Sequence, residues 1–549
     1  MDNKYSIIDY NYPVNFLEIN KTFIDFSNPD LYIKMQVLPF ILFNGSYFFL
    51  TWNRLFIFDK KFNNYIESFN KGKKYKICIL LLNKNNFTSC ILNLFKENAS
   101  NFAEYNKKIK NEYISHRNIL KIISFSIICF AIFIPNYFIH LYEILCVATI
   151  SFKFLLSIFG FFYNDKIKTI KNKSNDHKPI VSIIVPLYKE QCVLKQMIDM
   201  LKNINYILEK LDIKFVFEEE DKELIDLFNH YVKTNLLDNL NYDVIIVPSS
   251  QFKTKAKACN YALYFCYGKY TMLYDADDIA DQEQILNNIN IFQNDSSIVA
   301  IQNKLSYYNN NSYLINLFSL EYSLYFNLIL PALNKIGLIV PLSGSSNIFN
   351  TNKLHKEFKG WNSYNLTEDA ELGVRFNLFL QKKEKIAISN SYTYEDAPNN
   401  LIKWLKQRSR WIKGFIQTGI FFNQNIKIFF ANKNLSLSSK ILKFIFFQLI
   451  FSIPNYIFFT SFILPFVIFN IGDNANHLIY IAIYYFITNY TIILLGYIKK
   501  KKKHTIKSYI FFPIYLALNT IAIPLAMYSL IKNTFYWEKT THLKNKKIN

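Results

Sequence analysis

The stretch KYTMLYDADD, residues 269–278, joins a short run of β-forming residues to three carboxylates. Similar β-rich runs come before it, with a helical pattern after the first: PIVSIIVPLY (179–188), DIKFVFEE (212–219) and DVIIVPSS (243–250). Short apolar strands that alternate with helical segments are typical of a mostly parallel sheet with helices on both faces. We therefore predict an α/β domain over residues 164–413.

The composition of the whole chain indicates a membrane protein. Of 549 residues, 51% are hydrophobic and 18% aromatic, which is more than soluble domains usually carry. Apolar runs flank the α/β region at residues 122–163, 444–471, 478–498 and 508–531. A bilayer core requires about 20 apolar residues per helix, so the first run is long enough for two crossings. We predict a transmembrane hairpin over 119–163, interrupted at His140 and Glu143, and a C-terminal transmembrane region over 441–549.

The formal net charge of +22 does not by itself indicate a nucleic-acid partner. Much of the excess is lysine in short polar stretches between the apolar runs, such as residues 499–503, where the positive-inside rule places it on the cytoplasmic side. The basic residues form no long stripe, and no nucleic-acid-reading motif accompanies them. We predict no nucleic acid as partner. The seven cysteines form no CxxC pair, so no zinc site or disulfide framework is expected.

Charged residues follow the predicted strands, at the edge where open α/β sheets bind their ligands. Glu218 and Glu219 follow one strand, Lys255 lies in the basic stretch after another, and Asp275 and Asp277 end the opening stretch. Two carboxylates one residue apart can share a Mg²⁺ or Mn²⁺ ion, whose other ligands are waters and phosphates. An acidic loop that caps the next helix is the simpler interpretation, and a lone DxD does not decide between the two.

A second acidic motif lies in NLTEDAELGVRF, residues 365–376. Thr367 is placed to cap a helix beginning at Glu368, and acids near a helix N-terminus interact well with its dipole. The alternative is that Asp369 projects into a cleft at the sheet edge and acts as a general base.

The segment WLKQRSRWIKG, residues 404–414, combines cations with tryptophans. Helical spacing places Gln407, Arg410 and Trp411 on one face. Arginine can bind diphosphate oxygens with two donors, and an indole ring offers a flat platform for a sugar. Taken alone, the segment equally fits an amphipathic helix at the membrane surface.

In this order, DAD (275–277), TED (367–369) and QRSRW (407–411) resemble the motifs of membrane-embedded family 2 glycosyltransferases, the group of cellulose, chitin and hyaluronan synthases. The likeness to the bacterial XagB-like branch is closer and covers nearly everything from about residue 175 onward, including TKAKACNYAL, YDADDIADQEQI, GWNSYNLTEDAELGVRF and YWEKTTH. The resemblance implies a GT-A-type domain inserted between transmembrane helices of a bacterial inner membrane, on the cytoplasmic side.

The resemblance also implies an activity and a set of site residues. The enzyme would invert the anomeric centre as it moves a sugar from a nucleotide-diphosphate donor onto a growing β-linked polysaccharide. Asp369 would be the base, Asp275 and Asp277 would hold Mg²⁺ or Mn²⁺, and Trp411 and Glu368 would contact the acceptor. The donor would be held by Glu218, Glu219, Lys255, Asp275, Gln407, Arg408 and Arg410. The implied partners are the nucleotide-sugar, a glycan acceptor, the lipid bilayer and exopolysaccharide-secretion proteins.

The chain departs from the family pattern in two places. Many members carry Asp-Asp-Gly after the second strand, where this chain has EEED (218–221), and Ile348 stands where this branch is expected to have His. Residues 1–118 are predicted to form an N-terminal cytoplasmic domain that is faintly similar to the N-terminal domain of type II secretion ATPases, without the Arg- and Gly-containing motifs that bind a cyclic dinucleotide. Residues 414–440 are expected to lie at the membrane interface.

Two other functions remain open from the sequence. One is transfer of a single sugar to a polyprenyl phosphate, although such enzymes usually lack a tryptophan platform of this kind. The other is a catalytically degenerate membrane scaffold, against which the intact acidic, Arg410 and Trp411 positions argue.

Overall fold

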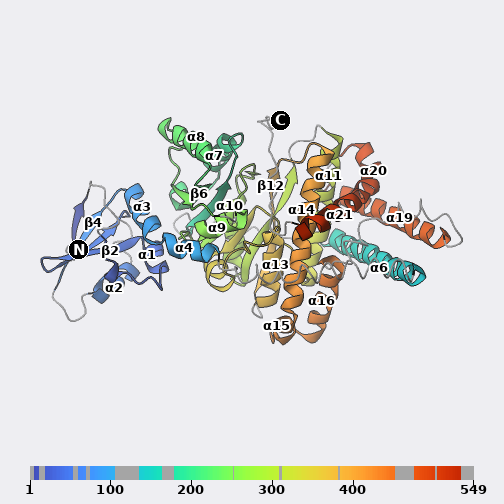
Figure 1. Cartoon of the computed structure of the whole chain (residues 1–549), viewed down its shortest axis with the longest axis horizontal. Helices are drawn as coiled ribbons and strands as arrows, with labels where there is room; N and C mark the ends of the chain where they lie inside the picture. Colours follow the sequence, from blue (N-terminus) through green and yellow to red (C-terminus); the bar gives the residue numbers. More distant parts are fainter. Residues whose placement is uncertain are drawn as a thin grey trace.

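The computed structural model describes residues 5–10, 19–53, 60–69, 75–104, 135–163, 178–250, 253–307, 312–380, 384–451, 475–500 and 504–532. Three parts follow one another along the long axis of the molecule (Figure 1). A small N-terminal domain lies at one end, an α/β domain in the middle, and long apolar helices at the other end.

The central domain is built on an eight-stranded sheet in the order β7-β6-β5-β8-β11-β10-β12-β9. Strands β5, β6, β7 and β8 pair in parallel and are the strands expected from the sequence. Only β11 and β9 run antiparallel to their neighbours. The bounds of the strands are β5 Val181–Leu187, β6 Leu211–Glu218, β7 Tyr242–Val247, β8 Tyr270–Leu273, β9 Ile279–Ala280, β10 Ile298–Tyr307, β11 Asn347–Asn350 and β12 Lys385–Glu395.

Helices cover both faces of this sheet, as continuous apolar strands require. On β5, Ile183 packs in the cluster formed with α7 and α10, whereas its neighbour Ile184 packs in the cluster formed with α9. Successive residues of a strand point to opposite faces of the sheet, and both side chains are fully buried because helices cover each face. The helices are α7 Leu194–Lys202, α8 Lys222–Lys233, α9 Lys255–Leu263, α10 Gln284–Asn294, α11 Tyr313–Leu324, α12 Leu330–Ile336 and α13 Glu368–Phe379.

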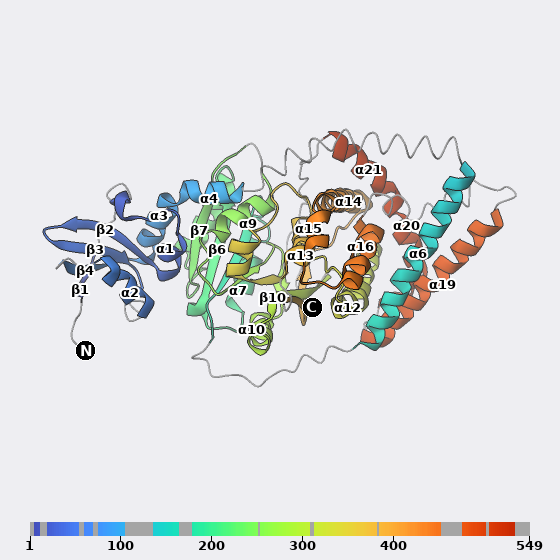
Figure 2. The ribbon, with the colours of Figure 1, turned by 90° about the horizontal axis from the view of Figure 1, so that it is seen from below.

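Within the described residues, the apolar end of the molecule has three helical segments that are long and apolar enough to cross a membrane: Glu143–Phe162, Ile479–Lys499 and Ile506–Lys532. In Figure 2, α6 and α19 run side by side away from the central domain, and they are in contact. The helices of this part are α6 Pro135–Phe162, α14 Leu401–Gln424, α15 Ile426–Ala431, α16 Leu437–Phe451, α19 Ala475–Lys500, α20 Ile506–Ala517 and α21 Asn519–Lys532.

The predicted interruption of the first apolar run at His140 and Glu143 is wrong. Helix α6 continues through His140 and Glu143 without a break. Residues three apart are neighbours on a helix surface, and here His140 Nδ1 lies 3.2 Å from Glu143 Oε2, so the two polar residues pair along the helix. Residues 119–134 of the predicted hairpin, and 452–471 of the first C-terminal run, lie outside the described residues.

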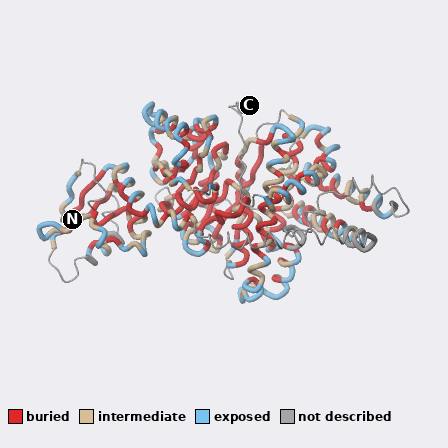
Figure 3. The backbone as a smooth tube through the Cα atoms, viewed as in Figure 1, coloured by how far each residue is buried: buried red, intermediate tan, exposed pale blue. Residues whose placement is uncertain are grey.

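Helix α14 is continuous across the predicted border between the α/β domain and an interfacial segment at residues 413 and 414. The motif QRSRW and the residues after it therefore belong to one rigid element. Figure 3 shows burial concentrated in the central domain, while α15 and α16 carry many exposed positions. Large apolar side chains are among these exposed positions: Ile428, Phe430, Leu437, Ile441, Leu442 and Ile445.

The N-terminal domain is an α+β unit with a four-stranded sheet in the order β1-β4-β3-β2. It contacts the central domain through Lys84, whose Nζ lies 3.0 Å from Asp243 Oδ1, and through α4, where Ser363 Oγ donates to Ala103 O at 2.7 Å. Its elements are β1 Ser6–Asp9, α1 Asp30–Met35, β2 Val37–Phe43, β3 Ser46–Thr51, α2 Lys60–Phe69, β4 Lys76–Leu81, α3 Lys84–Leu94 and α4 Lys96–Ala103.

Candidate active site

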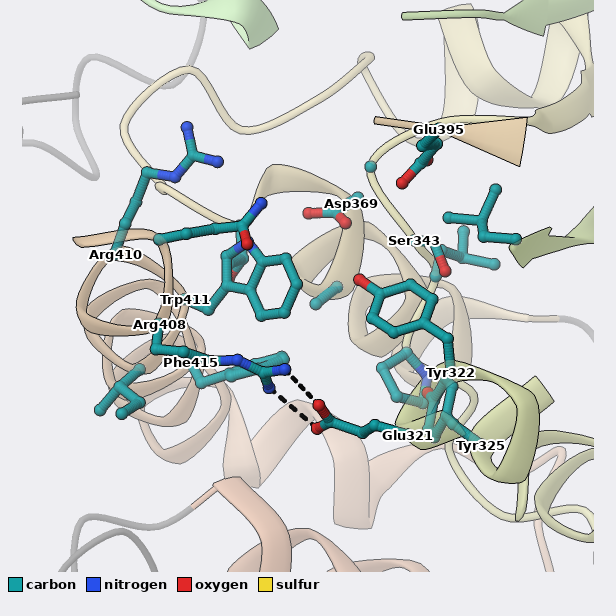
Figure 4. Close-up of a pocket in the computed structure, with 18 of the residues that line it drawn as sticks. Glu321, Tyr322, Tyr325, Ser343, Asp369, Glu395, Arg408, Arg410, Trp411 and Phe415 are labelled. Carbon is teal, nitrogen blue, oxygen red and sulfur yellow. Dashed lines mark hydrogen bonds and ion pairs between the residues drawn. The ribbon is translucent and has the colours of Figure 1, made fainter. Parts of the chain in front are cut away.

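A cavity of about 590 Å³ lies where the carboxyl ends of β5, β6 and β8 meet α13 and α14. Every site residue predicted from the sequence, except Glu219, lines it: Glu218, Lys255, Asp275, Asp277, Glu368, Asp369, Gln407, Arg408, Arg410 and Trp411. Three motifs that are distant along the chain thus share one hollow. Figure 4 shows Asp369 of the second motif together with Arg408, Arg410 and Trp411 of the third.

Lys255 places a fixed positive charge beside the DAD motif. It is the first residue of α9, and its Nζ forms an ion pair with Asp275 and donates to Gly344 O at 2.6 Å. Burial alone would lower the pKa of Lys255, but the charges of Asp275 and Glu368 raise it above its ordinary value. The ammonium group therefore stays protonated at neutral pH and can face a phosphate.

Several carboxylates crowd the loop after β8. Asp277 is buried and accepts from the backbone N of Asp396 at 3.1 Å, while Asp278 accepts from the backbone N of Asp275 at 2.8 Å. Burial, followed by the charges of Asp275 and Asp277, raises the pKa of Asp278 well above its usual range. Burial, followed by the charges of Asp278, Asp277 and Asp275, also raises the pKa of Glu395, which ends β12 and lines the cavity.

This donor set fits a hard divalent cation that also binds phosphate. Among the described residues, no group of three or more His, Cys, Asp or Glu side chains is disposed to hold a metal by itself. Mg²⁺ and Mn²⁺ do not require such a cage, because one or two carboxylates suffice when substrate phosphates and water supply the other oxygens. Asp275 and Asp277 provide two carboxylates on the cavity wall, in surroundings with excess negative charge.

Asp369 lines the same cavity and lies in the first turn of α13. It lies close to the loop before β11, since a Cβ at Gly344 would be 3.6 Å from Asp369 Oδ2 and 3.8 Å from Lys255 Nζ. Burial raises the pKa of Asp369 to about 6, an increase that Lys255 limits. Burial and the neighbouring Asp369 raise the pKa of Glu368 to about 7. Asp369 is thus a half-buried carboxylate that is still mostly ionised at neutral pH.

The contact between α13 and α14 explains why the second and third motifs meet. A Cβ at Gly414 would lie 2.5 Å from Thr367 Oγ1, so only glycine lets the two helices approach this closely. Leu366 N donates to Gln417 Oε1 at 3.0 Å, and Asn365 Nδ2 donates to Thr418 Oγ1 at 2.9 Å. The start of α13 is therefore held on one face of α14.

The predicted cap by Thr367 is wrong in detail. Helix α13 begins at Glu368 as expected, and Thr367 occupies the N-cap position, but its side chain makes no capping hydrogen bond. Its hydroxyl instead donates to Asn365 Oδ1 at 3.3 Å. The close approach of Gly414 turns the side chain to this neighbour.

Two residues that were predicted to bind the nucleotide-sugar donor, Glu219 and Arg408, interact with other residues of the chain instead. Glu219 is exposed and accepts from Ser249 N at 2.9 Å, a bond that lowers the pKa of Glu219, whereas its neighbour Glu218 points inward at the end of β6. Burial raises the pKa of Glu218 to about 7, although Lys257 opposes the shift. Arg408 lines the cavity, but its guanidinium is bound to Glu321, with Nη1 to Oε1 at 2.9 Å (Figure 4).

Ile348, where a histidine was expected, lies outside the cavity. It is fully buried in β11, opposite Met272 of β8 and Ile301 of β10. The residue therefore belongs to the core of the sheet, and its apolar character removes no group from the cavity wall.

Sequence reasoning missed Glu321, Glu395 and Asp278 as residues of the site region. Glu395 follows a strand end, so the rule that identified Asp275 could have found it. Glu321 lies inside the apolar stretch LFSLEYSLYF, where only its charge in apolar surroundings is a signal.

The cavity continues between the apolar helices. Its wall there includes polar residues of α6, α19 and α21: Thr149, Lys153, Tyr485, Thr488, Asn489 and Asn519. Lys153 Nζ donates to Asn489 Oδ1 at 3.5 Å, which supplies a partner for the charge inside a candidate span. Polar groups in such helices usually face a protein interior or a water-filled space, and here they face the cavity.

Two family models match the chain. "Glycosyl transferase family 2" matches residues 182–344, and "Glycosyl transferase family group 2" matches residues 270–498. The probable glycosyltransferase YdaM of Bacillus subtilis is 24% identical over 389 residues, which cover 68% of this chain and 87% of that protein.

Two further similarities are more distant. A poly-beta-1,6-N-acetyl-D-glucosamine synthase of Staphylococcus aureus (strain COL) is 26% identical over 176 residues, so the match spans 32% of this chain and less than half, 42%, of the synthase. A solved mannosyltransferase from Pyrobaculum calidifontis aligns with 66% of this chain and 100% of its own, at 13% identity and a TM-score of 0.38. Residues 182–344 thus match family 2 of the glycosyl transferases and residues 270–498 match family group 2, and the chain is a glycosyltransferase that uses a nucleotide-sugar donor.

Proposed function

We propose that this enzyme extends a β-linked polysaccharide at the inner face of a bacterial membrane and passes the product between its own helices. The observation that carries the proposal is the single cavity, which holds Asp275, Asp369 and Trp411 and continues among α6, α19 and α21. The partial match to a polysaccharide synthase and the ordered motifs of the XagB-like branch support the same assignment.

The donor diphosphate is assigned to the wall formed by Lys255, Asp275 and Asp277, with Gln407 and Arg410 facing it. Mg²⁺ or Mn²⁺ held by the two aspartates would offset the charge that develops on the leaving diphosphate. Lys255, kept protonated by its neighbours, contributes a second positive charge from the chain itself. We assign the nucleotide to the end of β6, where Glu218 lines the cavity and Glu219 does not.

Asp369 is assigned the role of general base. Its pKa of about 6 leaves it ionised at neutral pH, while it remains more basic than an exposed aspartate. The carboxylate removes the proton of the acceptor hydroxyl as the oxygen attacks the anomeric carbon on the face opposite the diphosphate. This geometry inverts the configuration of the anomeric carbon.

The acceptor is assigned to Trp411 and Glu368, beside Asp369. An indole face packs against the apolar face of a sugar ring whatever the position of the next linkage. Beyond this platform, polar side chains such as Thr488 and Asn489 offer hydrogen bonds to hydroxyl groups along the continuing cavity. A chain that grows at Trp411 therefore has a polar path into the helices.

Incubation of membranes that contain the enzyme with a panel of labelled nucleotide-sugars, plus Mg²⁺ or Mn²⁺, tests the proposal. UDP-N-acetylglucosamine is the first donor to try, because a poly-beta-1,6-N-acetyl-D-glucosamine synthase is among the relatives. We expect label from one donor in a polymer of many sugars. Label confined to a lipid-extractable single sugar would favour transfer to polyprenyl phosphate, and no transfer from any donor would favour a scaffold.

A further inference from the structure

Glu321 of α11 is a charged residue in the middle of the cavity wall without a role in the scheme above. Its carboxylate accepts hydrogen bonds from both terminal nitrogens of Arg408, and the distance from Nη1 to Oε1 is 2.9 Å. The hydroxyl of Tyr515 donates to Oε2 at 2.7 Å. Tyr515 in turn accepts from Arg408 Nη2 and from Trp404 Nε1, each at 3.0 Å. Helices α11, α14 and α20 are joined by this network.

Arg408 is also stacked among aromatic rings. Its guanidinium carbon lies 4.8 Å from the ring centre of Trp411, 4.9 Å from that of Phe318 and 5.1 Å from that of Trp404. Trp411 itself stacks on Phe318, with ring centres 6.0 Å apart and planes inclined by 22°. The planar cation therefore packs against the platform residue, where cation–π attraction favours contact.

An Arg408 side chain without Glu321 would be a buried cation with a strong preference for anions. The same cavity is expected to hold a diphosphate, for which a guanidinium is a strong ligand. Glu321 binds both terminal nitrogens of Arg408, so the guanidinium remains against Trp411 rather than turning toward the donor (Figure 4).

We propose that Glu321 is a positioning residue for the transfer reaction: it holds Arg408 against Trp411 and so fixes the aromatic platform across the cavity from Asp369. The inference rests on the proposed function, because Trp411 is the assigned acceptor platform. Through Tyr515 the same carboxylate ties the platform to α20, next to the path assigned to the product.

The test uses the full-length protein in lipid nanodiscs and compares Glu321→Gln with the unchanged enzyme. Labelled UDP-N-acetylglucosamine, or the donor of the panel that is consumed, is followed into polymer and into free sugar formed by transfer to water. We expect the KM for the donor to stay within about twofold, while the ratio of polymer to free sugar falls about tenfold or more, since small displacements of a positioning group cost this much. Tyr515→Phe is expected to change the ratio in the same direction by less.

Glu371→Gln is the matched control. Glu371 of α13 pairs in a similar way with two nitrogens of one arginine, with Oε1 at 3.0 Å from Arg375 Nε and Oε2 at 2.8 Å from Arg375 Nη2, and it does not line the cavity. Because this pair is more deeply buried than that of Glu321, the control variant loses at least as much stability and reports the effect of lowered stability alone. We expect it to leave the ratio of polymer to free sugar unchanged.

A second measurement reports on the surroundings of the Trp411 ring. With 5-fluorotryptophan incorporated, the ¹⁹F resonance of Trp411, assigned with Trp411→Phe, should shift or broaden in Glu321→Gln and stay in place in Glu371→Gln. An unchanged resonance and an unchanged product ratio in Glu321→Gln would overturn the inference, as would equal effects in both variants. If the unchanged enzyme makes no polymer from any donor, the proposed function fails, and the resonance alone decides whether Glu321 positions Trp411.

Discussion

At the scale of single residues, burial and neighbouring charges determine the protonation state of each ionisable group in the site. Lys255 and Asp369 are both half-buried, yet the lysine keeps its proton and the aspartate loses it at neutral pH. Opposite charges that face one cavity account for this difference. The two groups provide a cation for the leaving group and a base for the attacking one.

The rate of sugar transfer should depend on pH through Asp369. The pKa of this carboxyl is raised to about 6, so the base is ionised above that pH and protonated below it. We expect kcat to fall as the pH drops through 6, and the fall to begin at higher pH in Lys255→Met, because Lys255 holds the pKa of Asp369 down. A pH–rate profile with an acid limb near 4 in both proteins would contradict this assignment.

Substitution Asp369→Asn should separate binding from chemistry. The amide keeps the shape of the side chain but cannot accept the proton, and loss of a general base typically costs about 10²–10⁴-fold in rate. We expect isothermal titration with the donor and Mn²⁺ to show the affinity of the unchanged enzyme, with kcat lowered by that factor. Sugar transfer at the original rate would remove Asp369 as the base.

At the scale of elements, the pairing of α13 with α14 brings the second and third motifs to one cavity. The pairing depends on Gly414 against Thr367 and on two hydrogen bonds from the loop before α13. None of these contacts can be predicted from the local sequence, because the partners are about 50 positions apart.

Gly414→Ala should disturb this pairing. The added methyl would lie 2.5 Å from Thr367 Oγ1 and 2.6 Å from Thr367 N, so α14 has to move away from Asp369. Overpacking of this kind costs about 1–3 kcal/mol, and we expect a lower unfolding temperature together with a marked loss of kcat. Lys406→Ala, on the exposed side of the same helix, controls for helix propensity. Equal stability and activity in both variants would contradict the role given to Gly414.

Much of the fold and of the cavity could be predicted at this scale, and the failures have identifiable causes. The β-rich runs gave the strands, and the strand-end rule led to Asp275 and Asp277 because that rule depends only on chain direction. The pairing of Arg408 with Glu321 could not be predicted, because the two residues are 87 positions apart in sequence. The turn at His140 and Glu143 was wrong because polar residues three apart can pair on a helix surface instead of ending it.

At the scale of the whole molecule, the N-terminal domain is anchored by charges. Lys84 Nζ lies 3.0 Å from Asp243 Oδ1 and donates to Tyr242 O at 2.8 Å, while Asp243 also pairs with Lys214, which is buried. The lysine charges hold the pKa of Asp243 at about 2 although its burial acts in the opposite direction. Lys84 of the N-terminal domain thereby helps to neutralise the buried carboxylate of Asp243 on the edge strand β7.

Lys84→Met should loosen this docking. The variant leaves Asp243 with one lysine fewer in a largely buried site, where a lost charged hydrogen bond costs about 1.5–3 kcal/mol. We expect a lower unfolding temperature and faster proteolytic release of the N-terminal domain. Lys356→Met removes the more exposed pair with Asp30 at the same junction and should cost under about 1 kcal/mol. Similar losses in both variants would contradict the weight given to Lys84.

In the proposed reaction, all three motifs border one substrate. A cryo-electron microscopy structure of the enzyme in nanodiscs, bound to Mn²⁺ and the nucleoside diphosphate of its donor, would show whether they do. We expect the metal at Asp275 and Asp277, the diphosphate within reach of Lys255 and Arg410, and Arg408 still bound to Glu321. A diphosphate bound elsewhere, with Asp369 and Trp411 facing no part of the space beside it, would rule out the proposed arrangement.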